Sequence, residues 1–259
     1  MLILGISTST RQAGCAIGGH EGVLAMVQSA RGKRHAETLA PSIDVLRHHA
    51  QVDLDEIGCI AVDVGPGLFT GLRVGIATAK AMAHALRVPM IGIASLDLVA
   101  FPVRWTHRLV VAAIDARRGE LFMARYKQVP GGIQRLDDYV VCSPDDLASE
   151  LLATPDDILM VGDGALRYQE RFQGIVRVEM ADQGLAYPSA ASLVQLAHPK
   201  ALREEFVYPS ELSPIYMRPP DAAIGWASRD DVSPRRASAP PSESSSQVVP
   251  PDGNSIGSR

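Results

Sequence analysis

The 259-residue sequence lacks several features that would point to common classes of protein. It has only three cysteines, Cys15, Cys59 and Cys142, and the first two lie in apolar segments that are typical of buried strands. Such scattered thiols indicate a reducing compartment rather than a disulfide framework. Lysine and arginine (25) do not exceed aspartate and glutamate (29), and the net charge is −4. This balance gives no support for broad, charge-driven binding of nucleic acid.

Long apolar runs are missing too. The sequence opens directly into a short strand pattern, without the charged and apolar segments of a secretory leader. None of its apolar runs reaches the length of a membrane span. We therefore expect a cytoplasmic protein that makes no contact with a membrane.

Strand and helix patterns fill the first hundred residues. Three closely spaced strand patterns, at residues 2–7, 14–17 and 23–28, indicate an antiparallel meander. They are followed by a helix pattern at 38–50, a strand at 57–64, a helix at 70–87 and a strand at 90–93. A proline at position 41 is compatible with the first of these helices if it lies in the first turn.

A looser version of the same order follows. A predicted hairpin pairs residues 109–114 with 121–126, a third strand is expected at 138–142, and Ser143 is expected to begin a helix as its N-cap. Another strand at 158–161 leads into a helix pattern that ends near residue 172. Two such halves predict an α/β protein with a duplicated ribonuclease H-like fold. This is the architecture of actin-like ATPases, in which mixed sheets are flanked by helices.

We place the two predicted subdomains at residues 1–103 and 104–221. Beyond them the composition changes to serine, proline, arginine and aspartate, with few apolar residues. Such a segment cannot bury enough surface to offset the entropy of ordering it. Residues 222–259 are therefore predicted to form a disordered tail, in which Trp226 is the one residue that could dock.

Recognisable catalytic motifs are also missing. The sequence has no nucleophile elbow and no metal-binding histidine pair of the helical type. Actin-like ATPases need an acidic residue at the end of the first strand, and that position holds Ser7, a poor ligand for Mg²⁺. Asp63 and Asp115 end other strands and could partly replace it. We expect Asp115, however, to pair with Arg117 or Arg118 in a turn. We predict no catalytic residue, no metal and no cofactor.

The run from Gly65 to Gly75 joins a strand pattern to a helix pattern. Such a turn either presents backbone N–H groups to a phosphate or serves as a tight turn before a closely packed helix. Neither the Walker spacing nor the dinucleotide-binding spacing is present. We therefore favour the tight turn, with Thr70 as the N-cap of the helix.

The helix predicted at 70–87 is apolar on two sides. One side, which includes Leu72, Ile76 and Ala79, suits packing on the sheet of its own half. The other side is small and nearly uncharged, and could admit a second helix closely, either the helix at 38–50 of the same chain or a helix of a partner across a dimer interface. The candidate interface residues are Leu39, Ile43, Leu46, Thr70, Gly71, Val74, Gly75, Thr78 and Met82.

Four segments together resemble the bacterial TsaB (YeaZ) family, the non-catalytic subunit of the tRNA threonylcarbamoyladenosine synthesis complex. They are residues 2–9, 35–41, 65–75 and 115–120. The resemblance covers about residues 1–218 and is weaker in the second half. Apart from residues 2–9, the motif residues that carry it are His35, Glu37, Gly65, Pro66, Gly67, Phe69, Arg73, Asp115, Arg117 and Glu120.

The resemblance also shows departures that fit a non-catalytic protein. The related catalytic subunit, TsaD, binds metal through a histidine pair on its first helix, whereas His35 has no second histidine four residues on. Ser7 stands where the family usually has an aspartate.

What the resemblance implies is a scaffold that pairs with TsaD through the helices at 38–50 and 70–87. Together with the small ATPase TsaE, this pair supports transfer of threonylcarbamoyl to an adenosine beside the tRNA anticodon. The subunit would meet tRNA indirectly, through the complex, and could form a homodimer when alone.

Two rival functions stay under consideration. The first is an ATP-dependent phosphotransferase or a glycoprotease-like hydrolase of the same fold, which would need a carboxylate-bound Mg²⁺ or a histidine pair. The second is an independent tRNA- or ribosome-binding module. Its support is the short basic cluster Arg31, Lys33 and Arg34.

Overall fold

The computed structural model describes residues 1–30 and 35–218. The basic cluster of Arg31, Lys33 and Arg34, the tail predicted at 222–259 and Trp226 lie outside the described residues. Of the helices in the described part, none combines the length and the apolarity needed to cross a bilayer.

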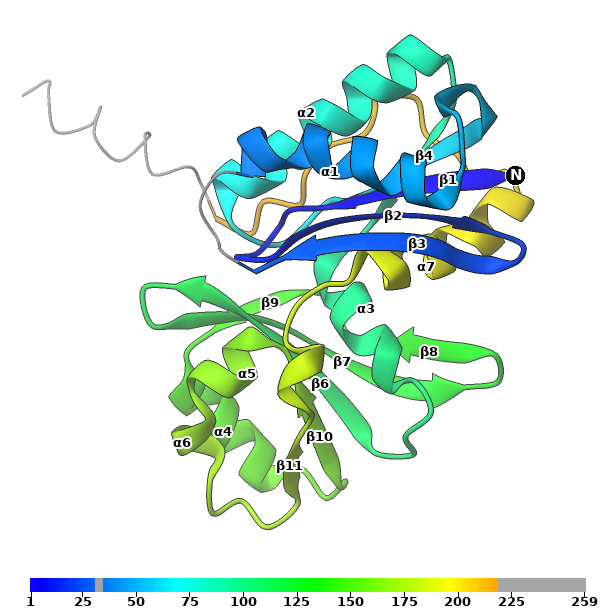
Figure 1. The fold of residues 1–259 in the computed structure, drawn as a ribbon. Helices are drawn as coiled ribbons and strands as arrows, with labels where there is room; N and C mark the ends of the chain where they lie inside the picture. The colour runs from blue at the N-terminus through cyan, green and yellow to red at the C-terminus, as the bar shows by residue number, and fades with distance from the viewer. Residues whose placement is uncertain (31–34, 219–259) are drawn as a thin grey trace, which may run out of the picture. The chain divides into compact units, whose positions relative to one another are not determined.

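The first part of the chain forms a five-stranded sheet in the order β3-β2-β1-β4-β5 (Figure 1). Its strands are β1 (Leu2–Ser7), β2 (Ala13–Gly19), β3 (Gly22–Ser29), β4 (Ile57–Asp63) and β5 (Met90–Ile93). β1, β2 and β3 are antiparallel neighbours, whereas β4 is parallel to both β1 and β5. The predicted meander is confirmed, and β2 is longer than expected because it pairs along its whole length with β3.

Helices cover both faces of this sheet. α1 (His35–Ala50) and α2 (Phe69–Leu86) lie side by side on one face, where their apolar residues join the strands in one core (Figure 1). The short η1 helix (Leu54–Glu56) leads from α1 into β4. α7 (Ala190–Leu202), far away in sequence, packs on the opposite face of the sheet.

The return of α7 corrects the predicted C-terminal subdomain of residues 104–221. Two residues after α7 also contact the first half, because Val207 bridges to Met90 of β5 and Leu212 enters the core beneath α1 and α2. α7 was not predicted from the sequence, and an apolar helix pattern carries no information about which sheet the helix covers.

α1 begins earlier than predicted, at His35 rather than at residue 38, so Pro41 lies inside the helix and not in its first turn. Pro41 is exposed, while Leu39, Ile43 and Leu46 are buried. A proline removes one helical hydrogen bond, and the burial of these three side chains offsets that loss.

The second part of the chain forms a six-stranded sheet, in which five strands have the order β11-β10-β6-β7-β8 and β9 also pairs with β7. Its strands are β6 (Leu109–Arg117), β7 (Glu120–Val129), β8 (Gly132–Arg135), β9 (Val140–Cys142), β10 (Ile158–Val161) and β11 (Val178–Met180). The third strand expected at 138–142 is only the short β9, and β8 and β11 are additional strands that the sequence patterns did not indicate.

Helices cover this second sheet as well. α4 (Pro144–Ala153), α5 (Asp163–Arg167) and α6 (Gln169–Phe172) share one core with one face, and α3 (Ser95–Ala100) packs on the other. Ser143 is the N-cap of α4, as predicted, because its hydroxyl oxygen accepts a hydrogen bond from the backbone N–H of Asp146 at 3.1 Å. The single helix expected up to residue 172 is broken into α5 and α6 at Tyr168.

The two sheets have the same topology. β6, β7, β8, β10 and β11 repeat the order and direction of β1, β2, β3, β4 and β5: two antiparallel neighbours on one side of the first strand and two parallel ones on the other. The chain therefore has the predicted duplicated ribonuclease H-like fold, with two mixed sheets flanked by helices. In such a sheet the ends of the first and fourth strands lie side by side, so each half brings two strand ends together.

Candidate functional site

A buried carboxylate closes the strand ends of the N-terminal half. Asp63 ends β4 and is only 2% exposed. The hydroxyl groups of Ser7 and Ser9 donate to its Oδ2 at 2.8 and 2.5 Å, and the Ser95 hydroxyl donates to Oδ1 at 2.5 Å. The backbone N–H of Gly65 donates to the same Oδ1 at 3.0 Å. One side chain therefore joins the end of β1, the loop after β4 and the start of α3.

This hydrogen bonding explains what Ser7 does at the position where an acid would stand in an ATPase. Ser7 is buried, and its neutral hydroxyl donates a hydrogen bond to the Asp63 carboxylate. Burial raises the pKa of Asp63, while the donors from Ser9, Ser95, Gly65 and Ser7 act in the opposite direction. With two donors on each oxygen, Asp63 has little capacity left for a metal ion or a water.

The Gly65–Gly67 turn packs against the loop after β1. Gly65 has a φ of 93°, which favours glycine, and the Gly65–Pro66 peptide bond is cis. A side chain at Gly67 would overlap the carbonyl oxygen of Ser9, which accepts a hydrogen bond from the N–H of Leu68 at 2.6 Å. This geometry agrees with the tight turn that we favoured, because the Leu68 N–H already has a partner within the chain.

The expected N-cap of α2 is wrong by two residues. The helix begins at Phe69, Leu68 occupies the N-cap position, and no side chain caps it. Thr70 is already inside the helix and exposed. The contact between Leu68 and Ser9 fixes the start of the helix in place of a side-chain cap.

The small-residue side of α2 faces its own chain at the first two turns. A Cβ at Gly71 would overlap the carbonyl oxygen of Thr8, and a Cβ at Gly75 would overlap the Thr8 hydroxyl. The Thr8 hydroxyl donates to the carbonyl oxygen of Gly71 at 2.7 Å. Gly71 and Gly75 are thus needed for close intramolecular packing, which corrects their assignment to a partner interface.

The other candidate interface residues fall into two groups. Leu39, Ile43 and Leu46 of α1 are buried in the core of the chain, so they too are corrected: their side chains are not available to a partner. Thr70 is exposed and Val74, Thr78 and Met82 are half-buried, so these four border the outer surface. The exposed residues beside them on α2 are Phe69, Arg73, Ala77, Ala81, His84 and Ala85.

Three motif residues, His35, Phe69 and Arg73, hold other segments of the chain in place. The Nε2 of His35 lies 3.0 Å from the carbonyl oxygen of Thr10. Arg73 donates to the Tyr216 hydroxyl at 3.1 Å and stacks on Phe69 with its guanidinium carbon 3.8 Å from the ring centroid. Phe69 in turn contacts the Tyr216 ring. His35 therefore supports the β1–β2 loop, and Phe69 with Arg73 fixes the last described segment of the chain on α2.

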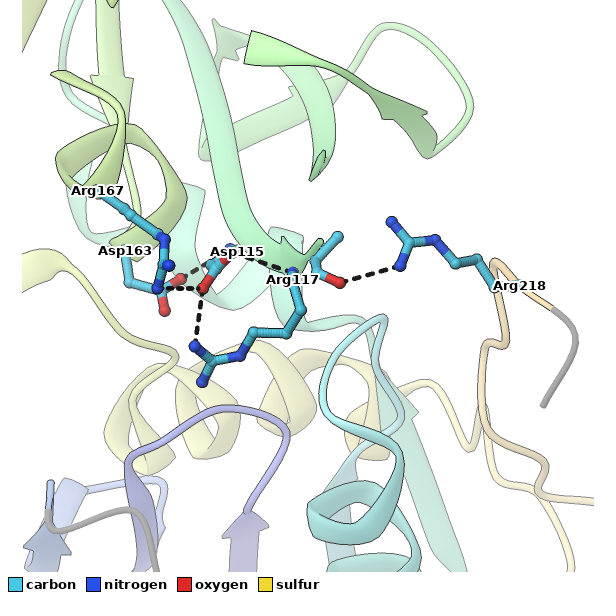
Figure 2. Close-up of polar contacts among 6 residues, drawn as sticks. Asp115, Arg117, Asp163, Arg167 and Arg218 are labelled. Atoms are coloured by element: carbon cyan, nitrogen blue, oxygen red, sulfur yellow. Dashed lines mark hydrogen bonds and ion pairs between the residues drawn. The ribbon is translucent and has the colours of Figure 1, made fainter. Parts of the chain in front are cut away.

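The strand ends of the C-terminal half carry charged pairs instead (Figure 2). Asp115 near the end of β6 is almost fully buried, and its Oδ2 lies 3.1 Å from Nη1 of Arg117 and 3.2 Å from Nη1 of Arg167. Its Oδ1 accepts the backbone N–H of Arg117 at 3.0 Å. The expected pairing of Asp115 with Arg117 is present. The Arg167 contact was not expected.

Asp163 is the second carboxylate of this cluster and was missed by sequence reasoning. Its Oδ1 accepts the backbone N–H of Asp115 at 3.1 Å. Burial raises the pKa of Asp163 to about 6, while the hydrogen bond from the Asp115 N–H lowers it. A signal was available, because Gly162-Asp163-Gly164 follows β10 just as the glycine turn follows β4.

A cavity of about 340 Å³ opens beside these carboxylates. Arg11 from the β1–β2 loop lines it together with Arg117, Arg167 and both aspartates. Glu120 of the same motif pairs with Arg218. Arg218 also donates to the Ala116 carbonyl oxygen, a contact that Figure 2 marks with a dashed line. In the described part of the chain, no three histidine, cysteine, aspartate or glutamate side chains gather as metal ligands would.

Comparison with known proteins shows which family the chain belongs to. Residues 23–226 match the family model described as "TsaD: tRNA N6-adenosine threonylcarbamoyltransferase". An uncharacterized protein of Mycobacterium leprae is 35% identical over 85% of this chain, which spans 56% of that protein's length. The tRNA threonylcarbamoyladenosine biosynthesis protein TsaB of Haemophilus influenzae is 27% identical over 84% of this chain and 94% of its own length.

A solved structure extends the agreement to three dimensions. The structure of YeaZ from Pseudomonas aeruginosa aligns with 83% of this chain and 99% of its own, at 28% identity and a TM-score of 0.73. Because the family model covers most of the chain and both the TsaB sequence and the YeaZ structure match along nearly their full length, this chain belongs to the TsaB (YeaZ) branch of the TsaD family.

Proposed function

We propose that this chain takes part in tRNA threonylcarbamoyladenosine biosynthesis as a non-catalytic subunit that pairs with a TsaD-type catalytic paralogue. A TsaE-type small ATPase would complete the complex, and tRNA would be modified on the catalytic partner. When no partner is present, the same surface would allow a homodimer. Membership of the TsaB branch supports the pathway, and one feature of the surface supports the pairing.

That feature is the outer stripe of α2, which we define as Thr70, Val74, Ala77, Ala81 and Ala85. These residues recur at spacings of three, four and seven, so they lie on one side of the helix, away from the buried Leu72 and Ile76. All are exposed except Val74, which is half-buried. Four of the five are alanine or valine, and α2 contains no acidic residue. Small side chains allow a second helix to approach closely, so this face suits helix-to-helix docking.

The non-catalytic part of the proposal is supported by the state of the two strand-end clusters. Asp63 has accepted two donors on each oxygen, and the buried Asp115 is paired with two arginines. Neither carboxylate is left free to hold Mg²⁺ for phosphoryl transfer. A phosphotransferase or glycoprotease-like hydrolase would have to break these contacts before its chemistry could begin.

The pairing is tested by light scattering after size-exclusion chromatography of the chain with the TsaD homologue of its host. We expect a one-to-one species with the native chain. We expect Ala81→Glu and Ala77→Glu each to weaken pairing more than tenfold, because a carboxylate would be buried without a partner. Val176→Glu, on the C-terminal half at a side chain that is 99% exposed, is the control and should pair normally.

Normal pairing of both alanine variants would exclude the outer stripe as the interface. Absence of any complex with the native chain, under conditions where both proteins are folded, would refute the pairing itself. The catalytic alternative has its own test: ATP with Mg²⁺ should leave the melting temperature of the isolated chain unchanged, and a saturable rise would revive it.

A further inference from the structure

An open groove lies on another part of the surface, away from the outer stripe of α2 and both strand-end clusters. Its volume is about 730 Å³. It is bordered by the β2–β3 turn, the segment after α3, the β7–β8 turn and α7. Both turns point to the same side of the molecule in Figure 1. The proposed function gives this groove no role.

An exposed tryptophan forms one wall of the groove. Trp105 is 66% exposed, which is unusual for the largest apolar side chain. Arg104 braces it, with the guanidinium carbon 4.7 Å from the Trp105 ring centroid and 4.0 Å from the Phe101 ring centroid. Nη1 of Arg104 also donates to the Phe101 carbonyl oxygen at 3.0 Å. The indole is therefore supported by Arg104 and exposed over most of its surface, so it is accessible to a stacking ligand.

The charge of the lining differs from that of the whole chain. Arg104, Arg203, His20 and His198 line the groove, and none of the described residues that line it is acidic. Arg203 forms an ion pair with Glu205, which offsets its charge. Arg104 therefore supplies the main positive charge of the groove. The chain as a whole has four more acidic than basic residues. A basic groove on an acidic protein favours an anionic ligand locally.

Glycines keep the rim low. Gly22 of the β2–β3 turn and Gly131 and Gly132 of the β7–β8 turn have open space where a side chain would begin. A ligand backbone can approach closely at such positions. The groove thus combines an aromatic platform, cationic side chains and accessible backbone, which are the elements that bind single-stranded nucleic acid.

We infer that this groove binds a single-stranded stretch of RNA, with a base stacked on Trp105 and a phosphate held by Arg104 and the nearby histidines. The inference deepens the proposed function, because it adds a direct contact between this subunit and an unpaired region of tRNA. An aromatic platform distinguishes RNA from a purely acidic peptide, which would need the cations but not the indole face.

The test measures fluorescence anisotropy of a labelled, unstructured RNA oligonucleotide titrated with the full chain at low salt. We expect saturable binding that weakens as salt rises, because phosphate contacts release counterions. Trp105→Ala should weaken binding about tenfold or more, since loss of stacking on one base costs that much. Trp105→Phe should keep most of the affinity, and Arg104→Ala should weaken binding and reduce the salt dependence.

Matched controls separate the groove from the rest of the surface. Leu152→Ala removes an apolar side chain that is 68% exposed, close to the exposure of Trp105, and Arg171→Ala removes an exposed arginine of α6. Both should bind RNA as the native chain does. The inference is overturned if the native chain does not bind RNA, or if Trp105→Ala and Arg104→Ala bind as tightly as the controls.

Two further outcomes distinguish the inference from its alternatives. Equal binding of a polyglutamate peptide, with no loss in Trp105→Ala, would identify a site for acidic peptides and overturn the RNA assignment. Pairing with the TsaD homologue is measured on the same variants and should be unchanged by Trp105→Ala. RNA binding without pairing would refute the proposed function alone, and pairing without RNA binding would refute this inference alone.

Discussion

In the N-terminal half, Asp63 is enclosed by three hydroxyl groups and one backbone N–H. At the corresponding strand ends of the C-terminal half, Asp115 and Asp163 face arginines and a cavity of about 340 Å³. Both halves have the same sheet order, so the difference comes from the side chains that the loops bring to the strand ends.

The donors decide how each carboxylate behaves. Hydroxyl and backbone donors are short and stay in place, so they can enclose Asp63 completely. Arg117 and Arg167 reach Asp115 from the surface, and their own side chains are 41% and 52% exposed. Solvent therefore screens the ion pairs of the second cluster. This cluster also borders the cavity of about 340 Å³. The first cluster suits a structural role, whereas the second keeps solvent access to charged groups.

The largest expected effect is the loss of the enclosed carboxylate. Asp63→Ala leaves the three hydroxyl groups and the Gly65 N–H without their acceptor in a buried site, and should lower the free energy of unfolding by about 3–5 kcal/mol. Asp115→Ala removes a carboxylate whose cationic partners can turn to solvent, and should cost only about 1–2 kcal/mol. Urea unfolding of both variants measures the difference.

Equal losses in the two variants would break the comparison between the halves. So would a loss below about 1 kcal/mol for Asp63→Ala, because it would mean that water replaces the missing carboxylate. If Asp115→Ala still formed the heterodimer, the outer stripe of α2 would be shown to fold correctly without the charged cluster.

The same comparison shows what could be predicted from sequence. Apolar periodicity and turn residues indicated β1 to β4, α2 and the N-cap Ser143 correctly, because these features depend on nearby residues. The short strands β8 and β11 pair with β7 and β10, which precede them in the chain, and they were missed because three or four residues give too short a pattern. The location of α7 on the first sheet depends on partners far away in the chain. A single sequence carries no direct record of such pairing.

The site illustrates the same limit. A helical projection identifies Gly71 and Gly75 as a small face, but it cannot show that Thr8 fills the space beside them. It likewise groups Leu39, Ile43 and Leu46 as an apolar stripe without showing that the sheet covers it. Asp163 could have been found by comparing the Gly162-Asp163-Gly164 turn with the earlier glycine turn, since the two follow equivalent strands.

A second prediction sharpens the role of the β1–β2 loop in the N-terminal half. Gly75→Ala should destabilise the chain by about 2–3 kcal/mol, because its Cβ would overlap the Thr8 hydroxyl. Thr8→Ala should remove that overlap at the cost of its hydrogen bond to Gly71, so the double variant should be less destabilised than the sum of the two changes. Thermal and urea unfolding of the four proteins complete the cycle.

Gly71→Ala provides the contrast within this cycle, since it would meet the Thr8 carbonyl oxygen, which no change of the Thr8 side chain removes. Thr8→Ala should therefore fail to rescue it. Gly132→Ala, which has open space at the Cβ position, is the control and should change stability by less than about 0.5 kcal/mol. Additive effects of Thr8→Ala and Gly75→Ala would contradict the packing assigned to the helix.

The smallest expected effect concerns the pH dependence of the C-terminal cluster. Burial raises the pKa of Asp163 from 3.8 to about 6, so the folded chain holds this proton more tightly than the unfolded chain. The resulting stabilisation is fully present below pH 3.8 and is lost as the pH rises through 6. Asp163→Asn removes this loss while keeping an oxygen that can accept the Asp115 N–H.

The free energy of unfolding of Asp163→Asn, relative to the native chain, should therefore be more favourable at pH 7 than at pH 4 by about 1–3 kcal/mol. Asp145→Asn, at a side chain that is 71% exposed, is the control and should show a smaller change with pH. Urea unfolding at the two pH values decides the matter. If the relative stability of Asp163→Asn were the same at both, solvent and the nearby Arg117 would already compensate the buried charge, and the contrast with the enclosed Asp63 would rest on geometry alone.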